Sequence, residues 1–468
     1  MPDVEFLIIG GGPCGLGAAR RLVQAGKSDV LVLEREPVFG GLAGSEYKNG
    51  YTWDYGCHVQ HSHYGEFDRA MIEALGEDGW YHHQRESWVW IDGRWVPYPF
   101  QNNIHRLSDV GRDACLDGLR TAHANQGTYG KPPADFAEWG KRTFGHGIYD
   151  QFFEPYNKKV WACPLEFMGW QWIGDRVAVP DLARVEKNVH DKADDMGWGP
   201  NSTFQFPKVG GTGGAWRALA DQLPDGFKRP GSTVVAVDLK GHRAHLLDGT
   251  TISYRHLIST VPLDLLAKAT GETPLIEAAG GLDYSATHVV GLGIDGTIPE
   301  VLSSMAWIYY PESDALFNRV TLFSNYSPAN VPDATKHWSI MLEISQSDTR
   351  PIDEDTLIDD VLAGCARTGL VPDISKVSEI WHKKLVRGYP TPSLTRDAAL
   401  GVLRPALEAQ DVYSRGRFGM WMYEASNQDH TFMQGSECVD RLLGRVDEEA
   451  GPEPTINRPQ WINAGRRD

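Results

Sequence analysis

The N-terminal segment VEFLIIGGGPCGLGAARRLVQAG places the strongest constraint on what this chain can fold into. An apolar run enters a glycine-rich turn with the pattern GxGxxG at Gly10, Gly12 and Gly15, and a helical pattern opening at Pro13 follows. The next apolar run, DVLVLERE, carries Glu34, 19 residues after Gly15. Glycines let the backbone approach a pyrophosphate, the N–H groups of the helix start bind it, and the acidic residue accepts from a ribose hydroxyl. The pattern predicts a dinucleotide-binding, Rossmann-like unit; the alternative is a glycine-rich turn of purely structural use.

A second glycine pair follows the acidic residue in REPVFGGLAGS, where Gly41 precedes Leu42. A chain that must pass close to the pyrophosphate and ring of FAD needs residues without side chains at this point. We therefore expect FAD rather than NAD, with an ordinary loop as the alternative.

Composition excludes several classes of protein. The chain has 45 Lys and Arg against 62 Asp and Glu, whereas a nucleic-acid-binding protein usually carries a basic surplus. Single basic pockets for phosphate remain compatible with this balance. No stretch approaches the ~18 apolar residues of a membrane span, and the apolar N-terminus lacks the basic flank of a signal peptide. The six cysteines form no CxxC pair, so we expect reduced thiols and a cytoplasmic location, with no nucleic acid and no membrane as partners.

The order of the patterns predicts a mixed α/β fold in which the FAD-binding domain is split along the sequence. We expect that domain to comprise residues 1–80, 205–284 and 401–468. Residues 105–204 show helical patterns and are expected to form an inserted helical domain. Residues 81–104 and 285–400 alternate in the manner of strands, with Asp92 and Gly93 as a hairpin turn, and predict a mostly antiparallel β-sheet domain.

The stretch DYGCHVQHSHY raises the question of a metal site, because Cys57, His58, His61 and His63 lie within eleven residues. In an extended segment His61 and His63 point to one side and His58 to the other, so at most two ligands meet. The sequence shows no second cluster of ligands elsewhere. We expect no metal here, and we expect His61 and His63 to serve packing or hydrogen bonding.

Seven motifs resemble one family over nearly the whole chain, and in the family's order: WVPYPFQNNI, PYNKKVWACP, GDRVAVP, WGPNSTFQFPKVGGTGG, FSNYSP, GYPTPSL and SRGRFGMWMYEASNQDH. The family is UDP-galactopyranose mutase, and the resemblance is strongest to its eukaryotic-type branch. Members interconvert UDP-galactopyranose and UDP-galactofuranose on reduced FAD without net redox change. The resemblance implies that flavin N5 attacks the anomeric carbon, that UDP leaves, and that the ring opens and recloses through a flavin iminium. The chain contains no GxSxG, HExxH or P-loop motif that would indicate a rival chemistry.

The resemblance also implies roles for single residues. Arg319 and Arg417 would clamp the diphosphate, because a guanidinium can bond phosphate oxygens in pairs, and with His58, Arg176 and Asn201 they form the expected catalytic set. His58 matches the histidine beside the N5 edge of the flavin, and the segments 176–189 and 200–206 would act as loops that close over the substrate. The expected substrate contacts are Tyr326, Tyr389 and Tyr423 at the diphosphate, Tyr98, Phe100, Gln101 and Phe152 at uracil, Asn157 and Trp161 on the uridine side, Trp307 and Tyr309 at nucleotide and sugar, and Asn427 at sugar and flavin. The expected FAD contacts are Gly10, Gly12, Pro13, Gly15, Glu34, Gly41, Leu42, Cys57, His58, Val234, Gly419, Asn427 and Gln428. NADPH is the expected reductant, with Arg85 and Ser87 as its contacts and Arg417 shared with the substrate.

Cys57 departs from the family pattern, in which fungal members carry glycine and bacterial-type members carry proline. A cysteine adopts positive φ less readily than glycine, so a backbone flip during flavin reduction would be harder or different here. Three alternatives to the mutase prediction stay open. They are the same chemistry on another nucleotide sugar, an amine-oxidase-type flavin oxidase, and a non-catalytic binding role. A homo-oligomer is also compatible with the sequence.

Overall fold

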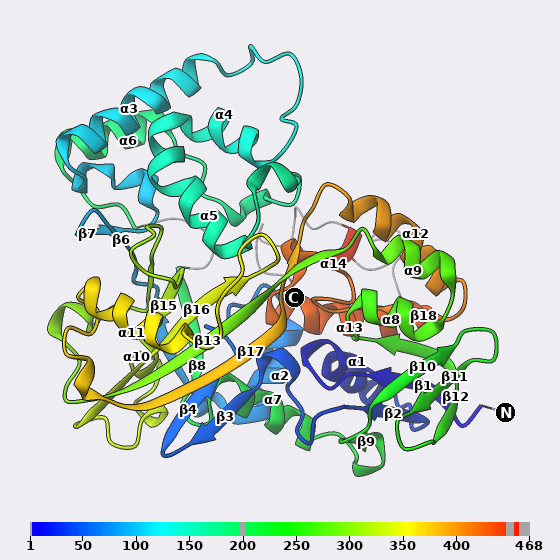
Figure 1. Ribbon diagram of the computed structural model, residues 1–468. Coiled ribbons are helices and arrows are strands. Elements are labelled where there is room, and N and C mark those ends of the chain that lie inside the picture. The colour runs from blue at the N-terminus through cyan, green and yellow to red at the C-terminus, as the bar shows by residue number, and fades with distance from the viewer. Residues whose placement is uncertain (1, 197–201, 446–453, 458–468) are drawn as a thin grey trace.

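A largely parallel sheet carries the glycine-rich turn (Figure 1). The computed structural model describes residues 2–196, 202–445 and 454–457. The strand order is β10-β11-β12-β1-β2-β9, and β18 pairs with β12. Its strands are β1 (Val4–Ile9), β2 (Val30–Leu33), β9 (Lys228–Arg229), β10 (Val234–Asp238), β11 (Arg243–Leu246), β12 (Thr251–Ser259) and β18 (Val412–Ser414). Strands that are distant in sequence therefore form one Rossmann-like sheet, in which β10 and β11 make an antiparallel extension.

Helices cover both faces of this sheet. On β1, Phe6 and Ile8 pack into one core, and the intervening Leu7 and Ile9 pack into another. A strand buried on both faces is the pattern of a parallel sheet between helical layers. A Cβ at Gly17 would lie 2.2 Å from the Phe432 carbonyl oxygen, so only glycine lets α1 and α13 pack this closely. The helices of this part are α1 (Pro13–Gln24), α2 (Gly65–Leu75), α7 (Gly211–Asp221), α8 (Leu263–Thr270), α9 (Thr273–Ala279), α12 (Arg396–Glu408), α13 (Gln428–Leu442) and α14 (Pro454–Asn457).

A second sheet, with the order β17-β13-β16-β15-β14-β6-β7, is antiparallel except for the β14–β6 pair. Its strands are β6 (Ser87–Ile91), β7 (Arg94–Pro97), β13 (Asp283–Asp295), β14 (Trp307–Tyr309), β15 (Arg319–Thr321), β16 (His337–Gln346) and β17 (Val377–Thr391). Helix α11 (Leu357–Arg367) packs on one face, where its residues share a core with Val290, Leu292 and Ile294. The hairpin of β3 (Ser45–Lys48) and β4 (Tyr51–Asp54) packs on the other face through Tyr51 and Trp53.

The helical part lies at the top of Figure 1 and comprises α3 (Asp109–Ala124), α4 (Phe136–Ile148), α5 (Glu154–Trp161) and α6 (Leu182–Asp191). Side-chain caps fix where three of these helices begin: Ser108, Asp135 and Asp181 each accept a backbone N–H from the first turn. The helices share a core with Val89, Ile91 and Val96 of the second sheet. A two-stranded ribbon of β5 (Trp80–Gln84) and β8 (Thr203–Pro207) links the chain before this part to the chain after it.

The fold class is confirmed, because a split Rossmann-like sheet, an inserted helical part and a mostly antiparallel sheet are all present. Two local predictions were wrong. Within the segments expected to act as loops, residues 182–189 belong to helix α6 and residues 203–206 to strand β8. Within residues 285–400, which were expected to alternate as strands, the run RVTLFSNYS is a strand only at Arg319–Thr321, and helix α10 (Phe323–Tyr326) follows.

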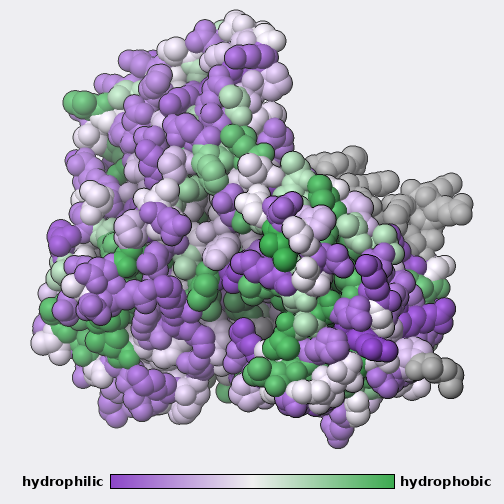
Figure 2. All heavy atoms as spheres, turned by 45° about the vertical axis from the view of Figure 1, so that its right-hand side comes forward, coloured by the Kyte–Doolittle hydropathy of each residue, from purple (hydrophilic) through white to green (hydrophobic). Residues whose placement is uncertain are grey.

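The surface seen in Figure 2 is mostly hydrophilic, and hydrophobic side chains gather in separate patches. Among the residues that the structure describes, no helix is both long and apolar enough to cross a membrane.

Candidate active site

The turn between β1 and α1 has the geometry that a bound dinucleotide requires. A Cβ at Gly15 would lie 1.9 Å from the Gly10 carbonyl oxygen, so the tight turn excludes any side chain there. No side chain caps α1 at Gly12. The Glu34 carboxylate accepts the N–H of Gly11 at 2.7 Å and the N–H of Glu36 at 2.8 Å. Each of its oxygens keeps a further lone pair that a ribose hydroxyl could use, so the turn fits the adenosine diphosphate half of FAD.

The other predicted cofactor residues come from several segments around α1 and α13, two helices that pack against each other, and from the sheet beside them. A Cβ on Gly41, which precedes Leu42, would lie 3.0 Å from the Cα of Gly12. Val234 begins β10, two residues after Ser232, whose N–H donates to the Glu34 carbonyl. Gly419 lies in the loop after β18, and Asn427 is the N-cap of α13. Gln428 then joins three segments, since it accepts from Trp216 of α7 at 2.6 Å and donates to the Val59 carbonyl at 3.3 Å.

The Cys-His stretch runs from the second sheet towards α13. The Cys57 N–H donates to Glu343 Oε1 at 2.9 Å. Burial lowers the pKa of His58 to about 4, with the charges of Arg417 and Arg319 acting in the same direction, so the imidazole is neutral at pH 7. His58 Nδ1 is buried and has no hydrogen-bond partner in the described chain. A buried polar atom without a partner fits a bound group that would provide one, as the flavin would at this position.

The sequence shows no second cluster of ligands elsewhere, but the structure brings Asp429 and His430 next to His63. His63, Asp429 and His430 are buried together with their ligand atoms within 4.8 Å of one another, the one such group among the described residues. His61 lies apart, with Nδ1 at 3.0 Å from the Thr203 carbonyl oxygen. His63 Nδ1 is 2.7 Å from Asp429 Oδ2, which is a hydrogen-bond distance, whereas two ligands of one tetrahedral zinc lie ~3.3 Å apart. The geometry is that of a hydrogen-bonded pair.

Arg319 and Arg417 both reach the site, but their partners differ. Arg319 donates from Nε and Nη2 to both carboxylate oxygens of Glu343, at 2.7 to 3.0 Å. Arg417 donates to the Gly388 carbonyl oxygen from Nε and Nη2 and to Ser426 Oγ from Nη1. Burial lowers the pKa of Arg417, yet a guanidinium stays charged near neutral pH. No carboxylate in the described chain bonds Arg417. A buried cation without a directly bonded anion is unfavourable, so this position favours an anionic ligand.

Arg176 and two tyrosines complete the cationic part of the site. The guanidinium of Arg417 lies 5.2 Å from the ring centre of Tyr389 and 5.6 Å from that of Tyr423. Arg176 lies 5.0 Å from the ring of Tyr423, donates to the Glu424 carbonyl oxygen, and approaches Asn427 Oδ1 at 3.4 Å. Trp161 packs edge-on against both tyrosine rings and is only 2% exposed. Residues from four separate segments thus converge on one positively charged aromatic cluster.

The register of the second sheet explains why Arg319 faces the site. On adjacent strands β14, β15 and β16, Tyr309 pairs with Arg319, and Arg319 pairs with Glu343. Directly paired residues on neighbouring strands point to the same face, so one row across the sheet carries a phenol, a guanidinium and a carboxylate.

The predicted uracil-binding residues form a continuous series of rings. Phe100 stacks on Phe152 with ring centres 4.7 Å apart, and Phe152 stacks on Tyr156 at 5.4 Å. Tyr156 meets Tyr309 edge-on at 5.1 Å, and Tyr309 lies 5.0 Å from Tyr98. A planar base could insert beside such rings.

Several predicted contacts are engaged within the protein instead. The Gln101 amide donates to the Ala178 carbonyl oxygen, and the Asn157 amide donates to the Phe153 carbonyl oxygen of its own helix at 2.7 Å. Trp307 and Tyr326 are 9% and 1% exposed. Of the two predicted NADPH contacts, Ser87 is buried, with 1% of its surface exposed. The charge of Arg85 is close enough to Tyr98 and Tyr309 to oppose the rise that burial causes in their pKa values. Asn201 lies outside the described residues.

Sequence reasoning missed three residues of this site: Tyr156, Glu343 and Ser426. Glu343 is 3% exposed and bonds both Arg319 and Cys57. Its signal was present, since it is the one acidic residue inside the apolar run WSIMLEIS. Tyr156 belongs to the motif PYNKKVW beside Asn157, but nothing in the sequence shows that its ring bridges Phe152 and Tyr309.

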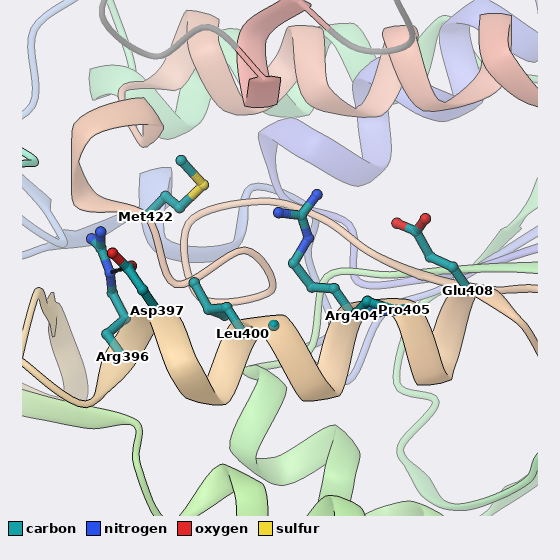
Figure 3. Close-up of a pocket in the computed structure, with 8 residues that line it drawn as sticks. Arg396, Asp397, Leu400, Arg404, Pro405, Glu408 and Met422 are labelled. Atoms are coloured by element: carbon teal, nitrogen blue, oxygen red, sulfur yellow. Dashed lines mark hydrogen bonds and ion pairs between the residues drawn. The ribbon is translucent and has the colours of Figure 1, made fainter.

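A cavity of about 490 Å³ lies elsewhere, along α12 (Figure 3). Two charged residues that line this cavity already have ion-pair partners. Arg396 bonds Asp397 and Glu424, and Glu408 bonds Arg415 and Arg441. None of the predicted site residues lines it.

Comparison with known proteins agrees with this arrangement. Residues 13–369 match the family of flavin containing amine oxidoreductases. A crystal structure of reduced UDP-galactopyranose mutase is 44% identical, with a TM-score of 0.94 over 100% of this chain and 98% of that chain. A protein described as a protoporphyrinogen oxidase from Exiguobacterium is 14% identical, with a TM-score of 0.71 over 95% and 100% of the two chains. Putrescine oxidase bound to putrescine is 15% identical, with a TM-score of 0.62 over 94% and 99%.

The last two likenesses extend to the fold alone, whereas the first spans both chains at an identity that defines a family. Within the fold shared with flavin-containing amine oxidoreductases, the chain belongs to the UDP-galactopyranose mutase family.

Proposed function

We propose that this protein interconverts UDP-galactopyranose and UDP-galactofuranose with FAD as its cofactor. Beside the family membership, one observation carries the proposal. Arg417 is a buried cation that no carboxylate of the described chain bonds, and it lies over Tyr389 and Tyr423 with Arg319 and Arg176 nearby. A diphosphate supplies the missing negative charge, whereas an amine substrate would add another positive one.

The protein's own residues then stabilise the departing UDP. Negative charge grows on the diphosphate as the bond to the anomeric carbon breaks, and Arg319 and Arg417 are fixed in place to meet it. Burial raises the pKa of Tyr389 well above its ordinary value, so its phenol keeps its proton and acts as a hydrogen-bond donor. Trp161 and Tyr423 form an apolar wall that excludes water from the sugar.

Reduced FAD, when bound along the turn at Gly10–Gly15 and the start of α13, supplies the nucleophile for the anomeric carbon. His58 would sit at the ring edge as a neutral imidazole, so Nδ1 can accept or donate a hydrogen bond according to its tautomer. Phe100, Phe152 and Tyr156 would hold the uracil ring.

Finer assignments are part of the same proposal. The seven sequence motifs support the eukaryotic-type branch, and NADPH is proposed as the reductant near Arg85. Ser87 is the weaker of its two contacts, because a buried hydroxyl must first be uncovered. A cytoplasmic location, a division into three domains and a homo-oligomer remain proposals from the sequence.

The decisive experiment gives the purified, FAD-loaded protein UDP-galactofuranose with and without dithionite and follows UDP-galactopyranose by chromatography. We expect conversion only after reduction. Conversion without reduction, or none with it, contradicts the proposal. A panel of other nucleotide sugars tests the substrate, since a clearly better member would replace galactose.

A further inference from the structure

Glu343 is the one carboxylate bonded directly to the arginines of the site, within the described residues. It is 3% exposed and shares both oxygens with Arg319. Burial alone would raise the pKa of Glu343, but the charge and hydrogen bonds of Arg319 and the Cys57 N–H outweigh burial and lower it. The group is therefore an ionised carboxylate inside a site that has to bind an anion.

The bonding pattern decides which edge of Arg319 remains for a ligand. Its Nε–Nη2 edge is occupied by Glu343, whereas Nη1 makes no hydrogen bond within the described chain. The Oε1 atom of Glu343 also accepts the Cys57 N–H, so the carboxylate is held from two sides. A guanidinium fixed by one edge presents the other without losing rotamer entropy at the moment of binding.

Glu343 also lowers the positive charge that a ligand meets. Its charge acts on Arg319, Arg417, His58 and Tyr389, opposite in sign to the arginines. Free UDP at about pH 8 carries one negative charge more than the diphosphate of a UDP-sugar, because its terminal phosphate has a second ionisation near pH ~6. A site with one more positive charge would therefore favour free UDP over the UDP-sugar.

We propose that Glu343 is a positioning residue of the diphosphate site: it aims Arg319 Nη1 at the substrate and keeps free UDP from binding too tightly. The inference rests on the proposed function and adds a determinant of discrimination between the sugar-bound and the free diphosphate. If UDP bound too tightly, the state with free UDP in the site would be over-stabilised, and the barrier for the sugar to return to UDP would rise. By weakening the binding of free UDP, Glu343 keeps that barrier low.

The test compares Glu343→Gln with the parent enzyme in its FAD-loaded, oxidised form, in which no turnover occurs. Calorimetry gives the affinities for UDP and for UDP-galactopyranose. We expect UDP to bind Glu343→Gln roughly tenfold more tightly or better, UDP-galactopyranose to change less, and kcat after reduction to fall. Equal affinities for UDP in the two proteins, or weaker binding of both ligands by the variant, overturn the inference.

Two further variants separate charge from structure. Glu343→Asp keeps the charge on a shorter side chain, so UDP affinity should stay near that of the parent while kcat falls. An unchanged kcat overturns the positioning role even if Glu343→Gln does not fold. Asp264→Asn is the matched control, because Asp264 is a buried carboxylate forked on Arg387 that bonds none of Arg176, Arg319 and Arg417, and we expect no change in either affinity.

Failure of the proposed function gives a different result from failure of this inference. If the parent itself binds neither UDP nor UDP-galactopyranose, the diphosphate site is wrong. If the parent binds both and Glu343→Gln shows no preference for UDP, only the role of Glu343 is wrong.

Discussion

The Asp429 carboxylate accepts two hydrogen bonds from His63, one from its backbone N–H at 3.0 Å and one from its ring Nδ1 at 2.7 Å. His63 ends the Cys-His stretch, and Asp429 lies in the first turn of α13 beside the predicted flavin contacts Asn427 and Gln428. The pair is 4% and 0% exposed. The stretch that suggested a metal site is thus tied by a buried ionic hydrogen bond to the helix expected to hold the flavin.

The first prediction concerns the stability that Asp429 provides. Burial opposes its charge, but the His430 ring and the hydrogen bond from His63 outweigh burial and lower its pKa from 3.8 to about 2. A lowered pKa stabilises the folded state above the unfolded pKa, and this stabilisation is lost as pH falls from about 4 to about 2. We expect Asp429→Asn to cost about 2 kcal/mol at neutral pH and to lose this deficit in acid. Thermal unfolding of both proteins against pH measures it, and a deficit that persists below pH ~2 contradicts it.

The second prediction is that zinc has no structural role at this pair. The distance between His63 and Asp429 is too short for two ligands of one ion, so binding would have to break the hydrogen bond. We expect added Zn²⁺ to leave the melting temperature unchanged and metal analysis of the purified protein to find no stoichiometric zinc. The control is Asp429→Asn, which should respond to zinc as the parent does. A rise in melting temperature that Asp429→Asn abolishes would establish a metal site.

The third prediction has the opposite sign. Asp54 is fully buried and accepts from Ser45 Oγ and the Thr212 N–H, and burial is the largest cause that raises its pKa to about 7. The folded protein therefore keeps a proton that the unfolded chain has released, so stability falls as pH rises from about 4 to about 7 and is constant above. We expect the parent to lose stability relative to Asp54→Asn over that range, by ~4 kcal/mol at most. Parallel stability curves for the two proteins would refute the raised pKa.

The fold was largely predictable because its signals are local. The glycine turn, the hairpin at Asp92 and Gly93 and the apolar run of β12 each follow from a few adjacent residues. The segment at Phe323–Tyr326 was not predicted, because its helix is a single turn of four residues, too short to show a helical period, and it follows directly on the strand Arg319–Thr321. Helix α6 lies inside the predicted helical part 105–204, and Asp181 caps its start, but the resemblance had implied a loop at residues 176–189.

The site was predictable in its members and less so in their contacts. Arg319 and Glu343 are 24 residues apart in the sequence, and they meet because of the register between β15 and β16. No short sequence pattern shows this register. Gln101 and Asn157 were expected to face the ligand, but their amides bond backbone carbonyls. Such choices depend on tertiary neighbours, and the roles of these residues stay predictions.

The fourth prediction concerns the thiol of Cys57, which lies among charged groups of the site. Burial is the main cause that raises its pKa, and Glu343 adds to it while Arg319 opposes it. Alkylation requires the thiolate, so we expect Cys57 to resist iodoacetamide in the folded protein at about pH 8, as read by peptide mass spectrometry. The same reagent on guanidine-unfolded protein is the control and should modify it fully. Rapid modification of folded protein would refute the raised pKa of the thiol.

The fifth prediction tests Arg417, a buried cation that bonds no carboxylate within the described residues. A lysine cannot reach the Gly388 carbonyl and Ser426 Oγ together while presenting a planar fork to a diphosphate. We expect Arg417→Lys to lower kcat/KM for UDP-galactofuranose under reducing conditions by roughly a hundredfold or more, because it weakens a buried charge pair in the transition state. Arg387→Lys is the matched control, since Arg387 also lies over a tyrosine ring, that of Tyr284 at 4.5 Å, but is already paired with Asp264. If both variants lose activity equally, the effect is structural and Arg417 does not bind the diphosphate.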